Sequence, residues 1–559
     1  MTTYKPCRKQ RAVIDSTDDV VVVLGGAGTG KTTTAAAAAR AHLEQSDALR
    51  SASGISRSAA SSPGPDRVLF LSFSRASVAR IISRSRAILG PYSDRVEVTT
   101  FHALAWRLIR RFGSGIDLPD PYLLTKAQAM LFNVRGALQY RDLVPKAMEL
   151  LELPAVADHV QHRWSLIVCD EFQDTDDRQY DFLCAIRGNA RLILLGDPNQ
   201  CIYASLPDAI GVSPGRLMAA LNLPGSRLIE LPEASHRDPS GVIPAAAAEI
   251  RRRKFDGPAL QVALNARRIQ VFRYEDLKSE ADVVAETVEA LRAEGLSVAV
   301  FSHHNDALAV LSDQLADAGV LHEISGLSES LSAAMDAQVT MGQYAAGLCE
   351  WKVVQQYLAI FVTSAVRGKQ VPALAHQILG AASASRTLQQ RLEALKAGLS
   401  QADDLASALD LAARAHEAIG LPNKASAWAR AAQMLRPMHA ASSRARYGRR
   451  PSNEQVLATL DRVVEDRRVA MLTEDTTETE AVVQLMNLHQ TKGREADATV
   501  VILRSTDFFG TERYEPFEEP SRLLYVVFTR ARKRVVVLLF GSGFGSLIAP
   551  IAGLAGLSG

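Results

Sequence analysis

Short runs of aliphatic and β-branched residues recur along the first 200 residues and predict buried strands. Val20–Leu24 is a continuous apolar run, as in parallel strands that are covered on both faces. Similar runs lie at Val68–Phe73, Val96–Thr99, Leu166–Cys169 and Leu192–Leu195, separated by segments of helical character. Strands that alternate with helices predict a doubly wound α/β core.

The pattern of apolar runs starts again in the second half of the chain. It predicts a second α/β domain with strands at Leu228–Leu231, Ile269–Tyr274, Val298–Ser302, Ala481–Leu488, Thr499–Leu503 and Val535–Phe540. Between the third and fourth of these runs, residues 325–480 are rich in Ala and Leu and contain few strand signals. This contrast predicts a helical block inserted into the second domain.

These patterns predict four parts of the chain. The first domain covers residues 1–227, with a small insertion at about 105–163, and the second covers 228–324 plus 481–541. The helical insertion covers 325–480, and residues 542–559 form an apolar, glycine-rich tail. Ser46–Asp66 is rich in Ser, Gly and Pro and predicts a flexible surface loop.

Composition narrows the class of protein. A chain of 559 residues is long enough for several domains, and 47% hydrophobic residues can fill sizeable cores. The net charge of +2 excludes a polycation, so nucleic-acid binding would need basic groups gathered on one surface. Five scattered cysteines without a CxxC pair argue against disulfide or zinc frameworks and favour a cytoplasmic location. No uninterrupted apolar run reaches membrane-spanning length, and we expect no membrane partner.

A glycine-rich loop follows the first predicted strand. Gly25-Gly-Ala-Gly-Thr-Gly-Lys-Thr32 fits the pattern of a phosphate-binding loop, and an Ala-rich helix begins at about Lys31. Its glycines allow backbone N–H groups to turn toward phosphate oxygens, and the helix adds its positive N-terminal end. Lys31 can reach the β- and γ-phosphates, and the Thr32 hydroxyl can bind Mg²⁺. The loop predicts binding of a nucleoside triphosphate.

A pair of carboxylates ends a later predicted strand and supplies the second half of such a site. Leu166-Ile-Val-Cys-Asp-Glu-Phe-Gln-Asp174 places Asp170 where a strand-end carboxylate holds Mg²⁺. Glu171 beside it can act as the general base that activates water. A strand ending in Asp-Glu is common by itself, but a phosphate loop earlier in the chain makes the combination specific.

The segment Asp-Glu-Phe-Gln-Asp resembles the corresponding motif of superfamily 1 helicases of the UvrD/PcrA/Rep type. That resemblance extends in order through both α/β domains, though not through the helical insertion. It implies two RecA-like P-loop NTPase domains with a helical insertion in the second. The other matching segments are Lys9-Gln-Arg-Ala-Val13, Leu71-Ser-Phe-Ser-Arg-Ala76, Thr99-Thr-Phe-His-Ala-Leu104, Leu195–Tyr203, Ser235-His-Arg237, Leu488–Glu495 and Arg522–Arg532.

The resemblance implies ATP and Mg²⁺ as cofactors and assigns roles to residues of these segments. The implied catalytic residues are Lys31, Asp170, Glu171, Gln200, Arg237 and Arg530, with Arg530 as the arginine finger. The implied nucleotide-binding residues are Gln10, Gly25, Gly26, Ala27, Gly28, Thr29, Gly30, Lys31, Thr32, Thr33, His236 and Glu495. The implied Mg²⁺ ligands are Thr32 and Asp170. The family usually has Tyr at the position of His236, whose imidazole can still stack on adenine.

The resemblance also implies contacts with DNA. The implied residues are Phe73, Arg75, Phe101, His102, Tyr203 and His489. After Tyr203 the family has an aromatic residue followed by Arg-Gly, whereas this chain continues Ala204-Ser-Leu-Pro207. Because stacking on an aromatic side chain contributes about 1–3 kcal/mol per base, this departure predicts a weaker grip on DNA.

Three functions follow as hypotheses. The first is an ATP-dependent helicase or translocase on single-stranded or tailed duplex DNA, moving 3′ to 5′ in repair, replication or genome defence. The second is an accessory ATPase that controls a partner nuclease in a DNA-processing or phage-defence complex. The third is a P-loop kinase or nucleotide switch, against which the Asp-Glu-Phe-Gln-Asp segment and the arginines in the second domain both argue.

Overall fold

The structure is a computed structural model of the chain. It describes residues 5–52, 66–72, 81, 85–132, 136–204, 209–232, 234–275, 280–303, 308, 311–312, 314–315, 319–324, 328–366, 370–380, 382–422, 424–444, 451–473, 483–507 and 514–556. The chain forms two compact units. Unit 1 comprises Met1–Pro119, Val144–Ser325 and Thr477–Gly559, and unit 2 comprises Asp120–Leu143 and Gly326–Thr476.

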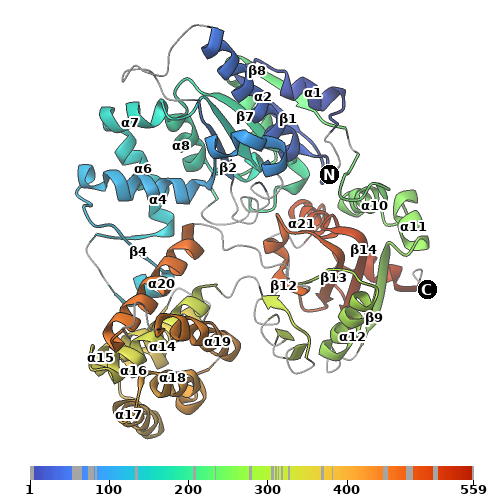
Figure 1. The fold of residues 1–559 in the computed structure, drawn as a ribbon. Helices are drawn as coiled ribbons and strands as arrows, with labels where there is room; N and C mark the ends of the chain where they lie inside the picture. Colours follow the sequence, from blue (N-terminus) through green and yellow to red (C-terminus); the bar gives the residue numbers. More distant parts are fainter. Residues whose placement is uncertain are drawn as a thin grey trace. The chain divides into compact units, whose positions relative to one another are not determined.

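The first sheet of unit 1 has the strand order β3-β2-β6-β7-β1-β8, and all its pairs are parallel. Its strands are β1 (Val20–Leu24), β2 (Val68–Ser72), β3 (Val96–Thr100), β6 (Leu166–Asp170), β7 (Arg191–Gly196) and β8 (Ser226–Glu230). The central strands are mostly apolar and buried because helices cover both faces of the sheet. Figure 1 shows β7 and β1 side by side in this sheet, whose two central strands are β6 and β7. The predicted α/β core is confirmed.

Strand β8 corrects the predicted domain boundary. The sequence pattern assigned Leu228–Leu231 to the second domain, but β8 pairs with β1 in parallel, with Val22 opposite Leu228. The main-chain N–H of Leu231 also donates to the carbonyl oxygen of Leu24 over 2.8 Å. Parallel strands are joined through long crossovers, so neighbours in the chain need not be neighbours in the sheet. The predicted boundary at residue 227 is therefore wrong, and the first sheet extends beyond it.

The helices around the first sheet are α1 (Arg8–Ile14), α2 (Lys31–Ala52), α4 (Phe101–Phe112), α6 (Leu143–Leu151), α7 (Pro154–Gln161) and α8 (Asp177–Arg187). Helix α2 begins at the predicted lysine but continues through Ser46–Ala52, where a flexible loop was predicted. Arg50 in its last turn lies 3.4 Å from the carboxylate of Asp66. This part of the loop prediction is wrong, and residues 53–65 lie outside the described part of the chain.

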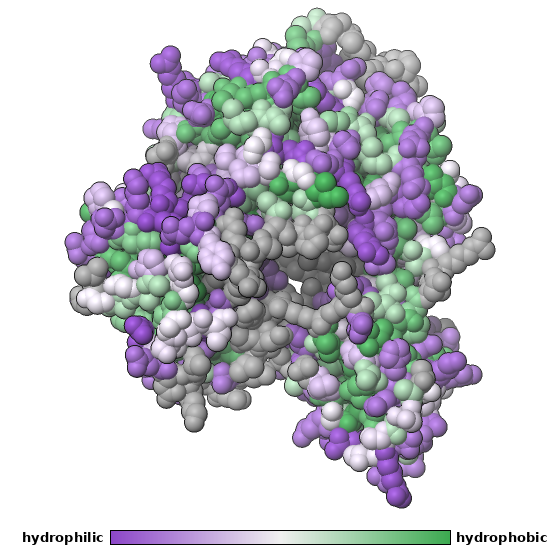
Figure 2. Space-filling view, turned by 180° about the vertical axis from the view of Figure 1, so that it is seen from behind, coloured by the Kyte–Doolittle hydropathy of each residue, from purple (hydrophilic) through white to green (hydrophobic). Residues whose placement is uncertain are grey.

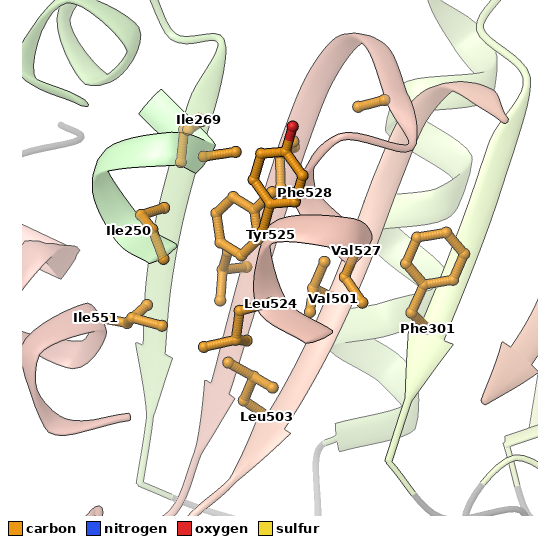
Figure 3. Close-up of a cluster of buried hydrophobic side chains, with 14 of the residues drawn as sticks. Ile250, Ile269, Phe301, Val501, Leu503, Leu524, Tyr525, Val527, Phe528 and Ile551 are labelled. Atoms are coloured by element: carbon orange, nitrogen blue, oxygen red, sulfur yellow. The ribbon is translucent and has the colours of Figure 1, made fainter. Parts of the chain in front are cut away.

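The second sheet of unit 1 has the order β11-β12-β10-β13-β14-β9 and is also parallel. Its strands are β9 (Ile269–Tyr274), β10 (Val298–Ser302), β11 (Glu323–Ile324), β12 (Val483–Asn487), β13 (Ala496–Arg504) and β14 (Ala531–Phe540). The core on one face includes Leu524 and Phe528 of α21 (Glu518–Phe528) and Ile250 of α10 (Val242–Arg251), packed over Leu503 (Figure 3). The opposite face is covered in part by α12 (Glu280–Ala293).

The C-terminal tail packs on this same core. Ile551 of α22 (Ala549–Ala552) is fully buried with the residues of α21 and β9, and Leu554 lies beside it. The predicted apolar tail is therefore packed against the core of the second sheet over the described residues up to 556.

Unit 2 is a helical body with a small two-stranded sheet. Its helices are α5 (Lys126–Leu131), α14 (Ser328–Ala345), α15 (Trp351–Ser364), α16 (Ala373–Ile378), α17 (Arg386–Ser400), α18 (Leu405–Ile419), α19 (Ala425–Ser442) and α20 (Asn453–Thr473). The rings of Phe361 and Trp428 meet edge to face in its core, 4.8 Å apart between centroids. The sheet pairs β4 (Tyr122–Leu124) with β5 (Ala137–Gln139).

The small insertion predicted at about 105–163 divides between the two units. Only Asp120–Leu143 joins the helical body, while α4, α7 and all of α6 except Leu143 stay with unit 1. Ala127 of α5 is buried in the core of unit 2, and its N–H donates to Glu329 over 2.9 Å. The segment packs there because its short helix has an apolar side that α15 covers.

The face shown in Figure 2 has a mixed surface. Among the residues that the structure describes, hydrophobic side chains form several separate patches between hydrophilic ones. Within the described ranges, every helix is too short or too polar to span a bilayer.

Candidate nucleotide site

The phosphate loop follows β1 and ends at the first turn of α2. Gly28 and Gly30 have φ values of 79° and 85°, a region that favours glycine. A Cβ atom on Gly28 would lie 2.3 Å from Oγ of Ser235, which leaves no room for a side chain. The loop and the N-terminus of α2 form a glycine-lined cradle of the kind that binds phosphate.

Lys31 and Thr32 begin the helix after the loop. The ammonium of Lys31 donates to the carbonyl oxygens of Gly25 and Gly26, at 2.5 and 3.1 Å. Burial lowers the pKa of Lys31, while nearby carboxylates, of which Asp197 has the largest effect, oppose this shift. The hydroxyl of Thr32 donates to Oδ2 of Asp170 over 3.2 Å.

The Thr32 hydroxyl and the Asp170 carboxylate fit a magnesium ion. Both are hard oxygen donors, and Mg²⁺ is commonly held by one or two such groups plus phosphate and water. In the described part of the chain no cluster of three or more His, Cys, Asp or Glu side chains is arranged to hold a metal by itself. The predicted metal ligands therefore suit a metal that arrives with a phosphate ligand.

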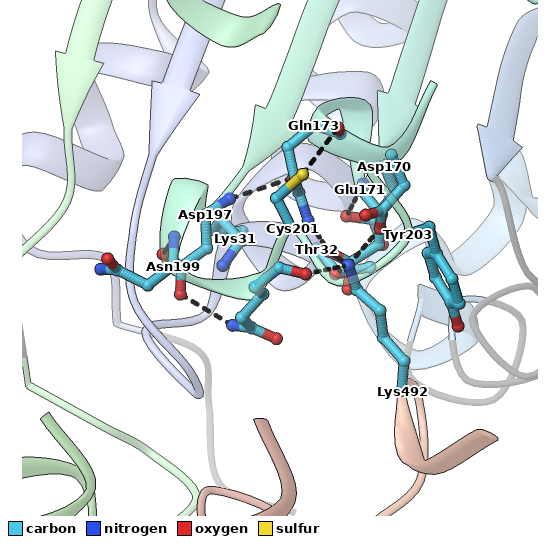
Figure 4. Close-up of polar contacts among 12 residues, drawn as sticks. Lys31, Thr32, Asp170, Glu171, Gln173, Asp197, Asn199, Cys201, Tyr203 and Lys492 are labelled. Carbon is cyan, nitrogen blue, oxygen red and sulfur yellow. Dashed lines mark hydrogen bonds and ion pairs between the residues drawn. The ribbon is translucent and has the colours of Figure 1, made fainter. Parts of the chain in front are cut away.

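Glu171 follows directly after β6 in a left-handed backbone conformation, with a φ of 57°. Such a conformation is uncommon outside glycine and tends to occur at functional sites. Nε2 of Gln173 donates to its carboxylate over 2.7 Å, and Gln173 in turn accepts from the N–H of Asp197 over 3.1 Å (Figure 4). The side chain is thereby oriented by a chain of hydrogen bonds that crosses from β6 to β7.

Gln200 and Arg530 bring the two sheets together. Gln200 lies after β7 of the first sheet, and Arg530 lies between α21 and β14 of the second. Nη2 of Arg530 donates to Oε1 of Gln200 over 2.9 Å, and Nε2 of Gln200 donates to Asp197 over 2.8 Å. The guanidinium of Arg530 also donates to the carbonyl oxygen of Val526. The arginine is 1% exposed and is held in one direction by these contacts.

Arg237 faces the same pocket. The sequence pattern assigned it to the second domain, but the structure does not place it in that domain alone. Its segment follows β8 of the first sheet, and the N–H of His236 donates to the carbonyl oxygen of Gly28 over 2.7 Å. The guanidinium of Arg237 is paired with Glu495 over 2.6 Å and donates to the carbonyl oxygen of Thr529. Arg237 therefore lies in the segment that connects the sheets, because β8 belongs to the first one.

The predicted base side of the pocket is formed by Gln10 and His236. Gln10 is buried, and its side chain accepts from the N–H of Cys7 over 2.9 Å and donates to the carbonyl oxygen of Thr29 over 3.3 Å. A Cβ on Gly30 would lie 3.1 Å from Nε2 of Gln10 and 3.3 Å from Cδ2 of His236. Both side chains thus flank the phosphate loop at the point where α2 begins.

These residues line one pocket of about 590 Å³, a size usual for small-molecule sites. The predicted residues in its wall are Ala27, Gly28, Thr29, Gly30, Lys31, Thr32, Thr33, Asp170, Glu171, Gln200, His236, Arg237, Glu495 and Arg530. Gln10, Gly25 and Gly26 support this wall through the contacts above. The sequence did not predict Lys5, Ala87, Ile88 and Arg532, which also line the pocket.

The residues predicted to contact DNA are brought together only in part. The hydroxyl of Tyr203 donates to the main-chain carbonyl oxygen of His489 over 2.8 Å, so the Tyr203 side chain lies against the backbone at His489. Phe101 is 1% exposed, and its contact with a DNA strand stays a prediction. His102 is half-buried at the start of α4. Phe73 and Arg75 lie outside the described residues.

Three buried polar residues near the site were missed. Asp174 and Asp197 surround the carboxylate network, and Lys492 reaches it from the second sheet (Figure 4). Burial lowers the pKa of Lys492, but the attraction of Asp174 and Glu171 outweighs this and raises it. All three residues belong to the segments that match the family motifs, and this could have marked them as site residues. The motifs do not indicate, however, which of their side chains contact one another.

The comparisons with known proteins agree with this geometry. Residues 9–206 match the family described as AAA domain, and residues 381–541 match the UvrD-like helicase C-terminal domain. The RecB subunit of the RecBCD enzyme of Mycolicibacterium smegmatis is 43% identical over 74 residues, which are 12% of this chain and 7% of the relative.

Two further relatives align over longer segments. DNA helicase II of Escherichia coli is 32% identical over 118 residues, or 21% of this chain and 16% of the relative. One of the subunits of the ATP-dependent helicase/nuclease of Streptococcus pneumoniae is 28% identical over 123 residues, or 21% of this chain and 10% of the relative. The aligned segments thus span a small part of each of these proteins.

Proposed function

The chain belongs to the UvrD-like superfamily 1 helicases, and on this premise we propose that it is an ATP-dependent helicase or translocase acting on single-stranded DNA. The observation that carries the proposal is the contact of 2.9 Å between Arg530 and Gln200. It joins Arg530, the implied arginine finger beside the second parallel sheet, to Gln200, an implied catalytic residue after β7 of the first. A kinase or simple nucleotide switch needs no such second sheet.

ATP binding would use the loop after β1. Backbone N–H groups of Gly28–Thr32 would surround the phosphates, with Lys31 exchanging its loop carbonyls for phosphate oxygens. Thr32 and Asp170 would hold Mg²⁺, which when bound neutralises charge on the phosphates. Gln10 and His236 would contact the adenine.

Hydrolysis would use groups from both sheets. Glu171 would accept a proton from the attacking water, since it is the oriented carboxylate beside Asp170. Arg530 and Arg237 would stabilise the negative charge that develops on the transferred phosphoryl group, which then leaves ADP and becomes phosphate. Because Arg530 is supplied by the second sheet, hydrolysis would be coupled to the relative position of the two sheets.

The strand would contact the side of this pair of sheets that carries Tyr203 and His489. A shared role of these two residues is supported by the hydrogen bond of 2.8 Å from the Tyr203 hydroxyl to the main-chain carbonyl oxygen of His489. The family resemblance favours travel from 3′ to 5′. The absence of an aromatic residue from the sequence Ala204–Pro207 favours translocation over strong unwinding by the isolated chain.

The test compares ATP hydrolysis with and without single-stranded DNA. Addition of an oligothymidylate is expected to raise the kcat for ATP hydrolysis many-fold. Hydrolysis is expected to be abolished by Lys31→Ala, and by EDTA in the wild type. Duplexes with a 3′ or a 5′ tail then test unwinding and polarity. Full hydrolysis without nucleic acid, or equal stimulation by RNA and duplex DNA, would contradict the proposal.

A second candidate is an accessory ATPase that controls a nuclease. It is favoured by the names of two relatives, one from a RecBCD enzyme and the other from a helicase/nuclease. The altered segment after Tyr203 also fits a motor that depends on a partner. Co-purification with a nuclease from the native host, together with weak unwinding by the chain alone, is the result expected for this candidate.

A further inference from the structure

Lys492 joins residues that the proposed function assigns to different tasks. Its ammonium lies 3.5 Å from Oε2 of Glu171, the proposed base, and forms a close ion pair with Asp174 (Figure 4). The side chain of Lys492 is 2% exposed, and that of Asp174 is fully buried. Because the two carboxylates hold the pKa of Lys492 above its ordinary value, the side chain is a cation at neutral pH. A buried ion pair of this kind tolerates little change in geometry.

The other contacts of Lys492 lead toward Tyr203 and His489, the two residues proposed above to contact the strand. Its ammonium donates to the carbonyl oxygen of Gln200 over 2.8 Å and lies 5.8 Å from the centre of the Tyr203 ring. The hydroxyl of Tyr203 reaches back to the carbonyl oxygen of His489, three residues before Lys492. Tyr203 is thus held at both ends by the segment Leu488–Lys492, at its hydroxyl by the main chain and at its ring by the ammonium.

We propose that Lys492 is a positioning residue through which the strand-facing pair, Tyr203 and His489, sets the position of the Glu171 carboxylate. This inference rests on the proposed function. A strand that displaces Tyr203 or the turn Leu488–Thr491 must also move Lys492, since all are linked by hydrogen bonds or by the chain itself. Lys492 then moves the carboxylate to which it is paired, so strand binding changes the alignment of the base.

The experiment separates positioning from simple stabilisation. Lys492→Met alone would leave two buried carboxylates without their cation and can unfold the protein. The decisive variant is therefore the charge-balanced pair Asp174→Asn/Lys492→Met, compared with Asp174→Asn alone and with Lys492→Arg. Lys533→Met is the control, because this lysine is 60% exposed and contacts only the surface carboxylate of Asp497 among the described ion pairs.

Four quantities are measured for each variant: melting temperature, KM for ATP, Kd for a fluorescent oligothymidylate, and kcat at saturating oligothymidylate. The charge-balanced variant is expected to melt within a few degrees of Asp174→Asn, with KM and Kd changed less than about threefold, while kcat falls by roughly tenfold or more. Lys492→Arg is expected to retain an intermediate kcat, since it keeps a cation there.

Two results would overturn the inference. One is a charge-balanced variant with the kcat of Asp174→Asn, which would make Lys492 a stabilising residue only. The other is a Lys492→Arg variant that is folded yet loses as much kcat as the charge-balanced one. A wild-type chain that is not stimulated by oligothymidylate would instead contradict the proposed function, so the two failures are distinguishable.

Discussion

Arg530 donates a hydrogen bond to the side-chain oxygen of Gln200 over 2.9 Å, joining residues that are 330 positions apart in the chain. Gln200 follows β7 of the first sheet, Arg530 directly precedes β14 of the second, and both line the pocket that contains the phosphate loop. Residues from both α/β domains thus line a single pocket, and this contact joins its two sides.

Replacement of Arg530 by Ala is expected to lower kcat by about 10³-fold or more, because an arginine finger contributes 10³–10⁵ to such reactions. The KM for ATP should change much less, since the loop residues bind the nucleotide. Arg534→Ala is the matched control, because Arg534 lies in β14, which begins just after Arg530, and is paired with Glu294 at the surface. Steady-state ATPase assays at saturating oligothymidylate measure both values. Equal kcat in the two variants would exclude Arg530 from hydrolysis.

Replacement of His236 by Ala is expected to raise the KM for ATP by roughly tenfold, with little change in kcat. Stacking of a base on an aromatic ring contributes about 1–3 kcal/mol, and the imidazole flanks the start of α2. His236→Tyr should restore a low KM, because a phenol ring also stacks. An unchanged KM in His236→Ala would place the base elsewhere.

Replacement of Gly28 by Ala is expected to abolish nucleotide binding while the protein stays folded. The new methyl group would lie 2.3 Å from Oγ of Ser235 and 3.0 Å from Cβ of Arg237, and the φ of 79° is unfavourable for alanine. Gly545→Ala is the control, since a Cβ there meets nothing within 4 Å. Binding of a fluorescent ATP analogue and the melting temperature are measured for both. Normal binding by Gly28→Ala would show that the loop has another conformation.

Burial lowers the pKa of His102 from its ordinary value of 6.5 to about 4. The folded state therefore binds fewer protons than the unfolded state between these values, and stability is lost as the pH falls from 6.5 toward 4. His102→Gln is expected to reduce the fall in melting temperature between pH 7.5 and 5.0. His159→Gln, a change at an exposed histidine, should leave that fall unchanged. An identical acid sensitivity in His102→Gln and wild type would contradict the prediction.

The residues that the sequence predicted well are those whose local pattern is sufficient. Val20–Leu24 and Leu166–Cys169 are continuous apolar runs because both faces of the sheet are covered, so pattern and burial coincide. The phosphate loop could be recognised because its glycines are required by backbone conformation and close contacts, which are local properties.

Other features depend on contacts between distant segments and could not be predicted in this way. Strand β8 is half-exposed at a sheet edge, and its sequence does not indicate that it pairs with β1. Lys492 and Asp174 are 318 residues apart, and nothing in either segment specifies their ion pair. Asp120–Leu143 lies between helices of unit 1 in the chain, yet its apolar residues pack in unit 2.

Because β8 pairs with β1, the chain passes from the first sheet to the second through the segment between β8 and α10, and this segment can act as a hinge. The main chain is fastened to the phosphate loop at His236, and Ile243 is already buried in the core of the second sheet. A rotation of the second sheet about so short a connection moves each atom in proportion to its distance from the axis. Arg237 lies on this connection, so it would keep its place beside the phosphate loop while the second sheet turns.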